Sequence, residues 1–341
     1  MNLTKKITAI LLVLAMLFAF SSCMGIEEDE TGELDIGTIN IGIIYNGDME
    51  EEGTLANKHF AAFQTAFDLA GAGGSQINQR DGVTPGDAEA MDKTMNDLLS
   101  RGCRLIITTD AGYYDGALKF AKENPSVFFV AMTEYGSAAQ EMSNFATFDI
   151  RTFETEYLEG MMAAASSANG KIGYVAATEN ATEVNAFANG AKSINPNATI
   201  SLVVTDDVKA GIDKITAAGC DTVYSMNYEV DEEGNRFFNV PESVKYDMCV
   251  NTLGDNGKFI SASCLNLDRL YTEIITDTVN EKFEDLKLFS AGVKEGVVDV
   301  RPAEDAALQA KVNAEKDKLF AGTSNINKLV STSIVLYTLV K

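Results

Sequence analysis

Short polar side chains stand directly after several apolar runs of the sequence, where buried strands would end. Asn46 and Asp48 follow the first run, Asp110 follows a later one, and Asn227 and Asn251 follow two runs in the second half of the chain. Amides and carboxylates hydrogen-bond the hydroxyl, amino and ring-nitrogen groups of small polar molecules. Each of these residues would serve equally well in a turn or as a helix N-cap. The pattern therefore indicates a site for a small polar solute, with local capping as the alternative.

Catalytic, metal-binding and nucleic-acid chemistry finds little support in the sequence. The 341 residues include one histidine, His59, which lies in an apolar helix pattern that favours a structural role, and there is no Gly-x-Ser-x-Gly, phosphate-loop or Gly-x-Gly-x-x-Gly motif. The net charge of −23 opposes binding to phosphate backbones. We therefore expect no enzyme, no cofactor, no metal and no nucleic-acid partner. Beyond the N-terminal segment the cysteines form no Cys-x-x-Cys pair and are expected as buried thiols, with disulfides left open: Cys103, Cys220, Cys249 and Cys264.

The first residues have the order of an export signal. Two lysines precede an apolar run at 7–20, which is too short to cross the ~30 Å core of a bilayer as a helix. We expect a signal peptide at 1–22, the alternatives being a retained anchor or a plain secretory signal. The order Ser-Ser-Cys resembles the lipobox of bacterial lipoproteins, which implies that Cys23 is acylated and becomes the mature N-terminus. The acidic stretch 23–37 predicts a solvated tether.

The rest of the chain alternates short apolar runs with segments of helical periodicity. Strands are predicted at 39–45, 104–109, 127–132, 171–177, 199–204, 220–226, 246–251 and 259–263, and helices at 55–69, 87–101, 117–124, 154–166, 183–194, 208–218, 241–245 and 267–282. Continuous apolar strands separated by helices predict α/β units, each with a parallel sheet covered on both faces. The length predicts two such units, with a ligand at the carboxyl ends of the strands, in the cleft between them.

Four stretches of the chain resemble the basic membrane protein family, which comprises solute-binding lipoproteins and includes purine-nucleoside receptors of bacterial ABC importers. Residues 148–164 resemble its arginine, glutamate and Tyr-Leu-x-Gly pattern, and residues 171–196 resemble its glycine-rich strand, helix and Asn-Pro stop. Residues 112–125 look like the segment after its third strand, and residues 291–297 look like its Gly-Leu-Lys-Asp-Gly-Gly-Val segment. The resemblance covers nearly all of the mature chain in order.

The family resemblance implies a type I periplasmic-binding-protein architecture, in which a hinge joins two Rossmann-like lobes with parallel sheets. Three crossings connect the lobes. We expect an N-terminal lobe formed by 38–147 and 259–288, and a C-terminal lobe formed by 148–258 and 289–341.

The family resemblance also implies a nucleoside in the cleft. The segment that supplies the family's base-stacking aromatic aligns with 54–56, where Leu55 stands instead. Asn251 stands where the family tends to hold the sugar with an aspartate, Lys294 matches a late lysine, and Asp110 occupies a strand end that contacts ligand in the family. These substitutions leave the scaffold in place and make the specificity an open question.

Without an aromatic at Leu55, another ring has to cover a purine base. Tyr113, Tyr228 and Phe187 stand near the predicted edges of the cleft. For Phe187, a core position on its helix is the alternative.

The combined expectation is an extracytoplasmic, lipid-anchored and monomeric receptor. It captures a small molecule, with a purine nucleoside or related base favoured, and delivers it to the permease of an ABC importer in the cell membrane. The alternatives are a ligand-sensing lipoprotein without transport and a receptor for a different solute such as a sugar or an amino acid. An exported enzyme is the least favoured.

Overall fold

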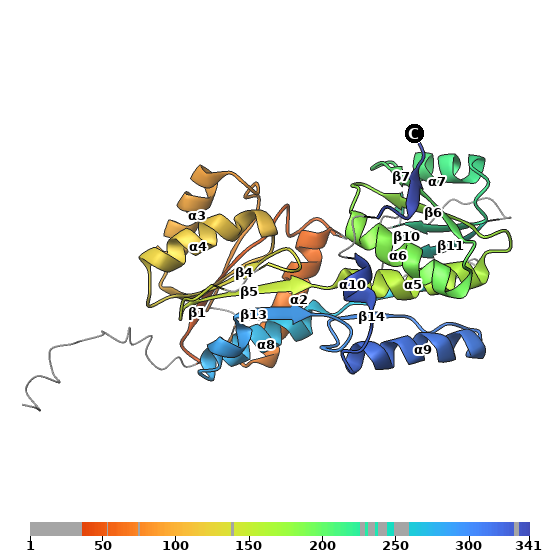
Figure 1. Cartoon of the computed structure of the whole chain (residues 1–341). Coiled ribbons are helices and arrows are strands. Elements are labelled where there is room, and N and C mark those ends of the chain that lie inside the picture. The colour runs from red at the N-terminus through yellow and green to blue at the C-terminus, as the bar shows by residue number, and fades with distance from the viewer. Residues whose placement is uncertain are drawn as a thin grey trace, which may run out of the picture.

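The chain folds into two α/β lobes that lie side by side (Figure 1). The computed structural model describes residues 36–52, 54–73, 76–137, 140–225, 229–230, 236–237, 244–248, 259–330 and 334–341. The predicted signal peptide, Cys23 and most of the predicted tether lie outside these residues. None of the described helices is long and apolar enough to cross a bilayer.

The N-terminal lobe contains one parallel sheet with the strand order β13-β5-β4-β3-β1-β2. Its strands are β1 (Asn40–Ile44), β2 (Ile77–Arg80), β3 (Cys103–Thr108), β4 (Phe128–Met132), β5 (Phe145–Ile150) and β13 (Leu288–Ala291), and its helices are α2 (Leu55–Leu69), η2 (Ala111–Tyr113), α3 (Ala88–Ser100), α4 (Tyr114–Glu123), α8 (Leu267–Val279) and η3 (Phe283–Leu286). The apolar side chains of α2 and α8 pack with one face of the sheet, and those of α3 and α4 pack with the other. Both faces are therefore covered, which explains why the central strands β1, β3 and β4 are mostly apolar.

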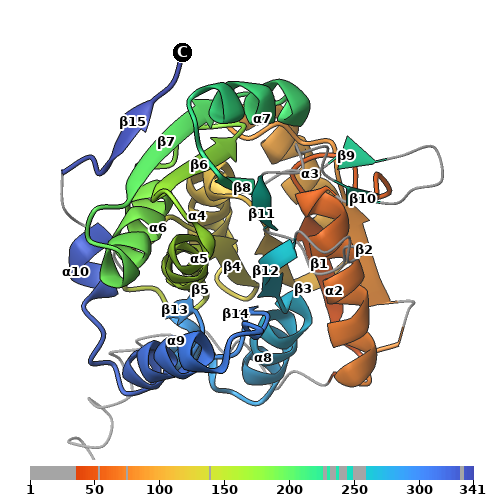
Figure 2. The ribbon, with the colours of Figure 1, turned by 90° about the vertical axis from the view of Figure 1, so that its right-hand side faces the viewer.

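The C-terminal lobe contains a second sheet with the strand order β14-β12-β11-β8-β6-β7-β15. Its strands are β6 (Lys171–Ala176), β7 (Thr199–Val204), β8 (Thr222–Ser225), β11 (Lys245–Met248), β12 (Phe259–Leu265), β14 (Val298–Val300) and β15 (Tyr337–Leu339), beside a small ribbon of β9 (Glu229–Val230) and β10 (Arg236–Phe237). The helices are α5 (Thr152–Ser166), α6 (Ala181–Ile194), α7 (Val208–Ala217), α9 (Ala306–Phe320) and α10 (Ile326–Val330). Only β14 runs antiparallel to its neighbour among the described pairs of this sheet, and Figure 2 shows β15 alongside β7 at the opposite edge.

Helices α5 and α6 approach each other closely through two glycines. A Cβ atom on Gly160 would stand 2.0 Å from the carbonyl oxygen of Phe187, and one on Gly190 would stand 1.8 Å from the carbonyl oxygen of Tyr157. Only glycine lets the two backbones touch in this way. The pair forms a compact wall at the centre of the C-terminal lobe.

Within the described residues the chain passes between the lobes three times. Strand β5 lies wholly in the N-terminal sheet, β12 belongs to the C-terminal sheet, and β13 returns to the N-terminal sheet. The expected boundaries at 147, 258 and 288 lie three to seven residues before the ends of these strands. The crossings follow β5, β12 and β13, because a strand at the centre of the molecule ends in one lobe and the next element begins in the other.

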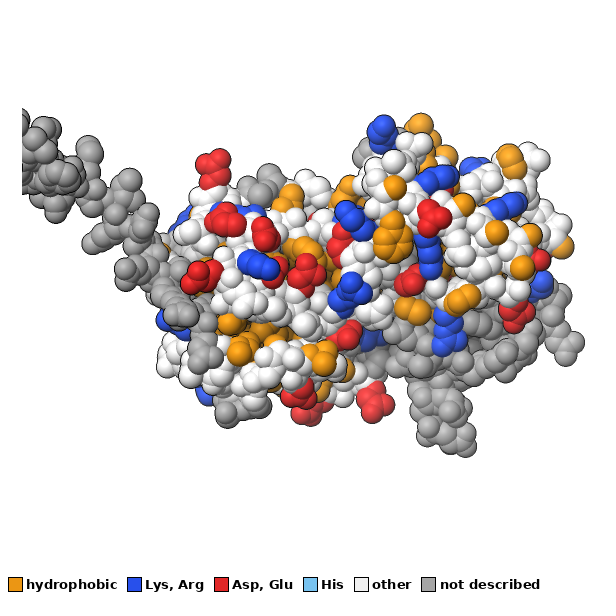
Figure 3. Space-filling view, turned by 90° about the horizontal axis from the view of Figure 1, so that it is seen from below, with side chains coloured by type: hydrophobic (Ala, Val, Ile, Leu, Met, Phe, Trp, Pro, Cys, Tyr) orange, Lys and Arg blue, Asp and Glu red, His pale blue; other side chains and the backbone are white. Residues whose placement is uncertain are grey.

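The outer surface carries charges of both signs. Viewed from below, acidic side chains are more frequent on the left of the view and basic ones on the right, with hydrophobic side chains among them (Figure 3).

Candidate ligand-binding cleft

A cavity of about 1280 Å³ lies between the two lobes. The N-terminal lobe contributes the start of α2, the segment after β4 and the end of β5, and the C-terminal lobe contributes the starts of α5 and α6, the segment after β7 and the end of β12. Strands of both sheets thus turn their carboxyl ends toward the cavity, as the α/β pattern predicted. The volume exceeds the usual range for sites of small molecules, so the cleft has room for one and for water.

Tyr135 supplies an exposed aromatic surface in the cleft. It follows β4 by three residues, lines the cavity and keeps 41% of its surface accessible. Its ring meets that of buried Phe153 at the start of α5, with centroids 4.8 Å apart and planes at 65°. The edge-to-face contact holds Tyr135 in place, which leaves the rest of its ring available to a ligand.

Carboxylates dominate the charged groups of the cavity. The described lining includes one lysine, Lys58, against Glu134, Asp149, Glu156, Glu179, Glu183 and Asp206. This excess of acceptors suits a ligand that carries hydroxyl, amino or cationic groups. It opposes a ligand that carries phosphate.

Three of these carboxylates are buried and already hold hydrogen bonds. Ser290 donates to Asp149 at 2.8 Å, and Thr152 donates to Glu183 at 2.6 Å. Burial raises the pKa of both acids, although each hydrogen bond opposes that shift. Glu156 accepts hydrogen bonds from two tyrosine hydroxyls of β6 and β8, so it ties α5 to the sheet. The exposed acids Glu134 and Asp206 are more readily available to a ligand, whereas exposed Glu179 accepts a hydrogen bond from the Tyr337 hydroxyl.

The structure brings two of the sequence-predicted polar residues together beside the cavity. Asn46 donates from Nδ2 to Oδ2 of Asp110 at 2.8 Å, and Oδ1 of Asp110 accepts from the backbone of Gly112 at 2.8 Å, capping η2. Asp48 is exposed and accepts a bond from the backbone of Glu50 at 2.8 Å. None of the three lines the cavity, although Ala111, next to Asp110, does. Asp110 thus has the capping role and Asp48 the turn role named as the alternative, whereas Asn46 bonds the Asp110 side chain.

Leu55 lines the cavity and Lys294 does not. The Leu55 side chain is 54% exposed at the start of α2, where Thr54 caps the helix. Lys294 is exposed in the turn that joins β13 to β14. Asn227, Tyr228 and Asn251 lie outside the described residues.

Tyr113 and Phe187 are core residues, which corrects the expectation that either covers a base. Tyr113 is 1% exposed, and its hydroxyl lies within hydrogen-bonding distance of the carbonyl oxygens of Tyr45 and Val83. Phe187 is fully buried, with its ring 5.3 Å from that of Tyr174. Both belong to helices whose apolar faces turn to a sheet. The sequence shows the periodicity but not which helix edge reaches the cleft.

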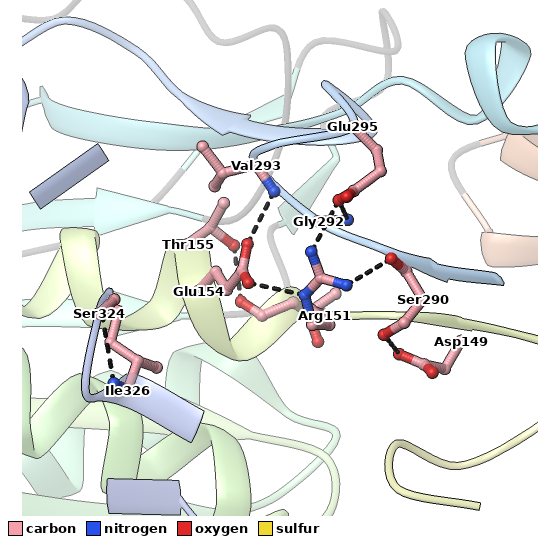
Figure 4. A network of polar contacts seen from close by, with 11 residues as sticks. Asp149, Arg151, Glu154, Thr155, Ser290, Gly292, Val293, Glu295, Ser324 and Ile326 are labelled. Carbon is pink, nitrogen blue, oxygen red and sulfur yellow. Dashed lines mark hydrogen bonds and ion pairs between the residues drawn. The ribbon is translucent and has the colours of Figure 1, made fainter. Parts of the chain in front are cut away.

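A buried ionic network joins two of the crossings (Figure 4). The Arg151 guanidinium pairs with Glu154 at 2.7 Å and with Glu295 at 2.7 Å, and it also donates to the carbonyl oxygen of Ser290. Glu154 in turn accepts from the backbone of Val293 at 2.7 Å. The turn after β13 is thus fastened to the start of α5. The arginine and glutamate of the resembling stretch at 148–164 therefore have a structural role in the hinge.

Gly292 is required at the centre of this network. A Cβ atom there would lie 2.3 Å from Oε2 of Glu154 and 2.5 Å from Nη2 of Arg151. Its backbone N–H donates to Glu295 at 2.8 Å. A side chain at this position would push the ion pairs apart.

Two curated proteins are similar to part of the chain. A purine-binding protein of Brucella abortus is 32% identical over 120 residues, which are 34% of this chain and 32% of that protein. A putative ABC transporter glucose-binding protein of Haloferax volcanii is 30% identical over 123 residues, which are 35% of this chain and 30% of that protein. The matches thus span about a third of the length of each relative.

The fold is similar to that of solved solute-binding proteins. An ABC transporter solute-binding protein from Conexibacter woesei superposes with a TM-score of 0.63 at 18% identity, covering 84% of this chain and 97% of the other. At this identity the likeness supports the type I periplasmic-binding-protein fold. The model of the PnrA-like ABC transporter substrate-binding proteins matches residues 57–235, more than half of the chain. The chain therefore belongs to the basic membrane protein family of PnrA-like ABC transporter substrate-binding proteins.

Proposed function

We propose that the chain captures a purine nucleoside or a related base in the interlobe cleft and delivers it to the permease of an ABC importer. The observation that carries this proposal is a cavity lined by both lobes, with the ring of Tyr135 and several exposed carboxylates in its wall. The purine-binding relative favours the same ligand class.

Tyr135 takes the role that an aromatic at Leu55 would have had. Stacking of a base on an aromatic ring contributes roughly 1–3 kcal/mol of binding energy, as measured by replacing the aromatic residue with alanine. A leucine side chain has no ring face and does not supply this contribution. The cleft carboxylates then accept hydrogen bonds from the exocyclic amino group of the base or from ribose hydroxyls. A nucleotide is rejected, because its phosphate enters a cleft with an excess of negative charge.

Ligand capture works through closure of the two lobes. Because the cleft is lined from both lobes, a solute that contacts both binds the closed state more tightly than the open one. Only this difference in affinity shifts the hinge population. A micromolar ligand supplies about 8 kcal/mol in total. The closed molecule then presents one paired surface to the permease.

A thermal-shift panel followed by calorimetry tests the ligand class. Adenosine, guanosine, inosine and the free bases are compared with ribose, glucose, arabinose and amino acids. Stabilisation by a nucleoside or base supports the proposal. Stabilisation by a sugar or an amino acid alone refutes the purine assignment and leaves the family membership untouched.

A sugar receptor is the second candidate, favoured by the glucose-binding relative and by the number of carboxylates available to hydroxyl groups. The same panel separates the two. Transport is distinguished from sensing by uptake of the labelled solute in cells with and without the gene. Unchanged uptake in the deletion strain favours a sensing role.

We further propose that the protein is exported and held at the extracytoplasmic face of the cell membrane by acylation of Cys23. The order of lysines, apolar run and Ser-Ser-Cys supports this assignment. Mass spectrometry of protein extracted from its native membrane should find a lipid-modified Cys23 as the first residue. An unmodified Cys23, or cleavage elsewhere, removes the lipoprotein assignment.

A further inference from the structure

The single histidine of the chain lies in the wall of the cleft with one ring nitrogen unpartnered. His59 stands on α2 one turn after Leu55, lines the cavity and is 1% exposed. Its Nδ1 lies 2.6 Å from the hydroxyl oxygen of Tyr271 on α8. Its Nε2 is buried and has no hydrogen-bond partner among the described residues.

We propose that Nε2 of His59 donates a hydrogen bond to an acceptor atom of the bound solute, and that Tyr271 fixes the imidazole tautomer that makes this possible. The solute is therefore one that offers a ring nitrogen, a carbonyl oxygen or a hydroxyl oxygen to this wall. The inference rests on the proposed function in placing the solute in this cleft.

The tautomer of His59 follows from the hydrogen bond that the buried hydroxyl of Tyr271 has to make. The Tyr271 side chain is fully buried, and within the described part of the chain its hydroxyl has one hydrogen-bond partner, Nδ1 of His59. If Nδ1 carried the proton, the phenol proton would be left without an acceptor, which is costly in the interior. The phenol therefore donates to Nδ1, and the imidazole proton resides on Nε2.

The imidazole stays neutral under physiological conditions. Burial, together with the nearby Lys58, lowers the pKa of His59 to about 3. The edge-to-face contact with Tyr271, in the packing of α2 on α8, holds the ring in place. A neutral N–H in a fixed position is suited to discriminate a solute by its acceptor, since a solute without one leaves the donor unpaired.

Nitrogen NMR on the mature protein tests the tautomer without ambiguity, because the chain has one histidine. With ¹⁵N-labelled histidine, we expect a protonated Nε2, an unprotonated Nδ1, and no titration between pH 5 and 8. Saturation with adenosine, inosine or guanosine should then move the Nε2 signal more than the Nδ1 signal. A proton on Nδ1, an imidazolium ring, or an unmoved Nε2 signal while calorimetry shows binding would overturn the inference.

Substitutions separate a binding role from a packing role. His59→Leu should weaken solute binding at least tenfold, whereas His59→Gln keeps a donor and should recover part of the loss. Phe67→Leu is the control, because Phe67 is fully buried on the same helix and does not line the cavity; it should lower stability and leave affinity unchanged. Equal affinity of His59→Leu and the unmodified protein contradicts the inference.

A ligand-independent measurement keeps the inference testable if no purine binds. The double variant His59→Leu with Tyr271→Phe removes the unpartnered Nε2–H and also the Tyr271 hydroxyl that bonds Nδ1. We therefore expect the melting temperature of the unliganded protein to rise by about 2–4 °C. A panel in which every nucleoside and base fails refutes the purine assignment alone. The nitrogen NMR of His59 and the melting temperature of the double variant then test the inference. A lower melting temperature in the double variant counts against the inference.

Discussion

Removing the Arg151 side chain should destabilise the protein strongly, because the substitution leaves two carboxylates without their cation. Arg151 has a side chain only 12% exposed, and its partners Glu154 and Glu295 are 4% and 21% exposed. Breaking a buried ion pair from one side costs about 3–5 kcal/mol. Both carboxylates keep a backbone N–H donor, from Val293 and Gly292 respectively. We therefore expect Arg151→Ala to lower the free energy of unfolding by about 3 kcal/mol, at the lower end of that range.

Urea unfolding followed by circular dichroism measures this loss, with Arg101→Ala as the matched control. Arg101 pairs with Asp97 at 3.1 Å on the surface, where its side chain is 52% exposed, so its removal should cost less than about 1 kcal/mol. Arg151→Lys keeps a charge but not the forked geometry and should fall between the two. If Arg151→Ala were as stable as Arg101→Ala, the network would be a surface feature and the reasoning about the hinge would be refuted.

Three further predictions concern the cleft. Tyr135→Ala should weaken nucleoside binding by about 1–3 kcal/mol in calorimetry and Tyr135→Phe by much less, because the ring supplies the contact; equal losses in both would point to the hydroxyl instead. Adenosine should bind and AMP should not, since the carboxylates repel phosphate, and AMP binding at similar affinity would disprove the electrostatic argument. Burial raises the pKa of Glu183 above its ordinary value of 4.5, so its charged form costs stability above that pH. Glu183→Gln should therefore stabilise the protein at pH 7, with the gain fading as the pH falls toward 4, and a gain that grows on acidification would reverse the assigned sign.

The location of the cleft was predictable because parallel strands end at one edge of a sheet. The rule identified the right edge of both sheets, and the segment containing Leu55 does line the cavity. The same rule applied to the predicted strand 127–132 leads to Tyr135, but the aromatic residues considered for the cleft were Tyr113, Tyr228 and Phe187. The exposed ring of Tyr135 in the cavity wall was therefore missed.

The wrong and missing predictions arose where the hydrophobic periodicity of the sequence fits more than one arrangement. The helix patterns around Tyr113 and Phe187 show an apolar face without showing which residues turn to the core and which reach the cleft. Strand β2 was not predicted because its sequence, Ile-Asn-Gln-Arg, is polar at the edge of the sheet. Helix α9 was missed because charged residues interrupt its apolar positions on every side. Local sequence patterns cannot reveal such choices, which depend on the neighbours in the fold.

Because the chain crosses between the lobes, the N-terminal lobe cannot be completed until the last of its elements has been synthesised. Helix α2 of the N-terminal lobe packs on α8, and β5 pairs with β13, yet both partners come from the far side of the C-terminal lobe in the sequence. At roughly 5–20 residues per second, synthesis takes on the order of ten seconds to proceed from the end of β5 to the start of α8. During that interval α2 can pack on the strands already made, but the side of α2 that contacts α8 has no native partner. A nascent chain that cannot complete its first lobe remains unfolded longer, which is the state that a translocation channel accepts.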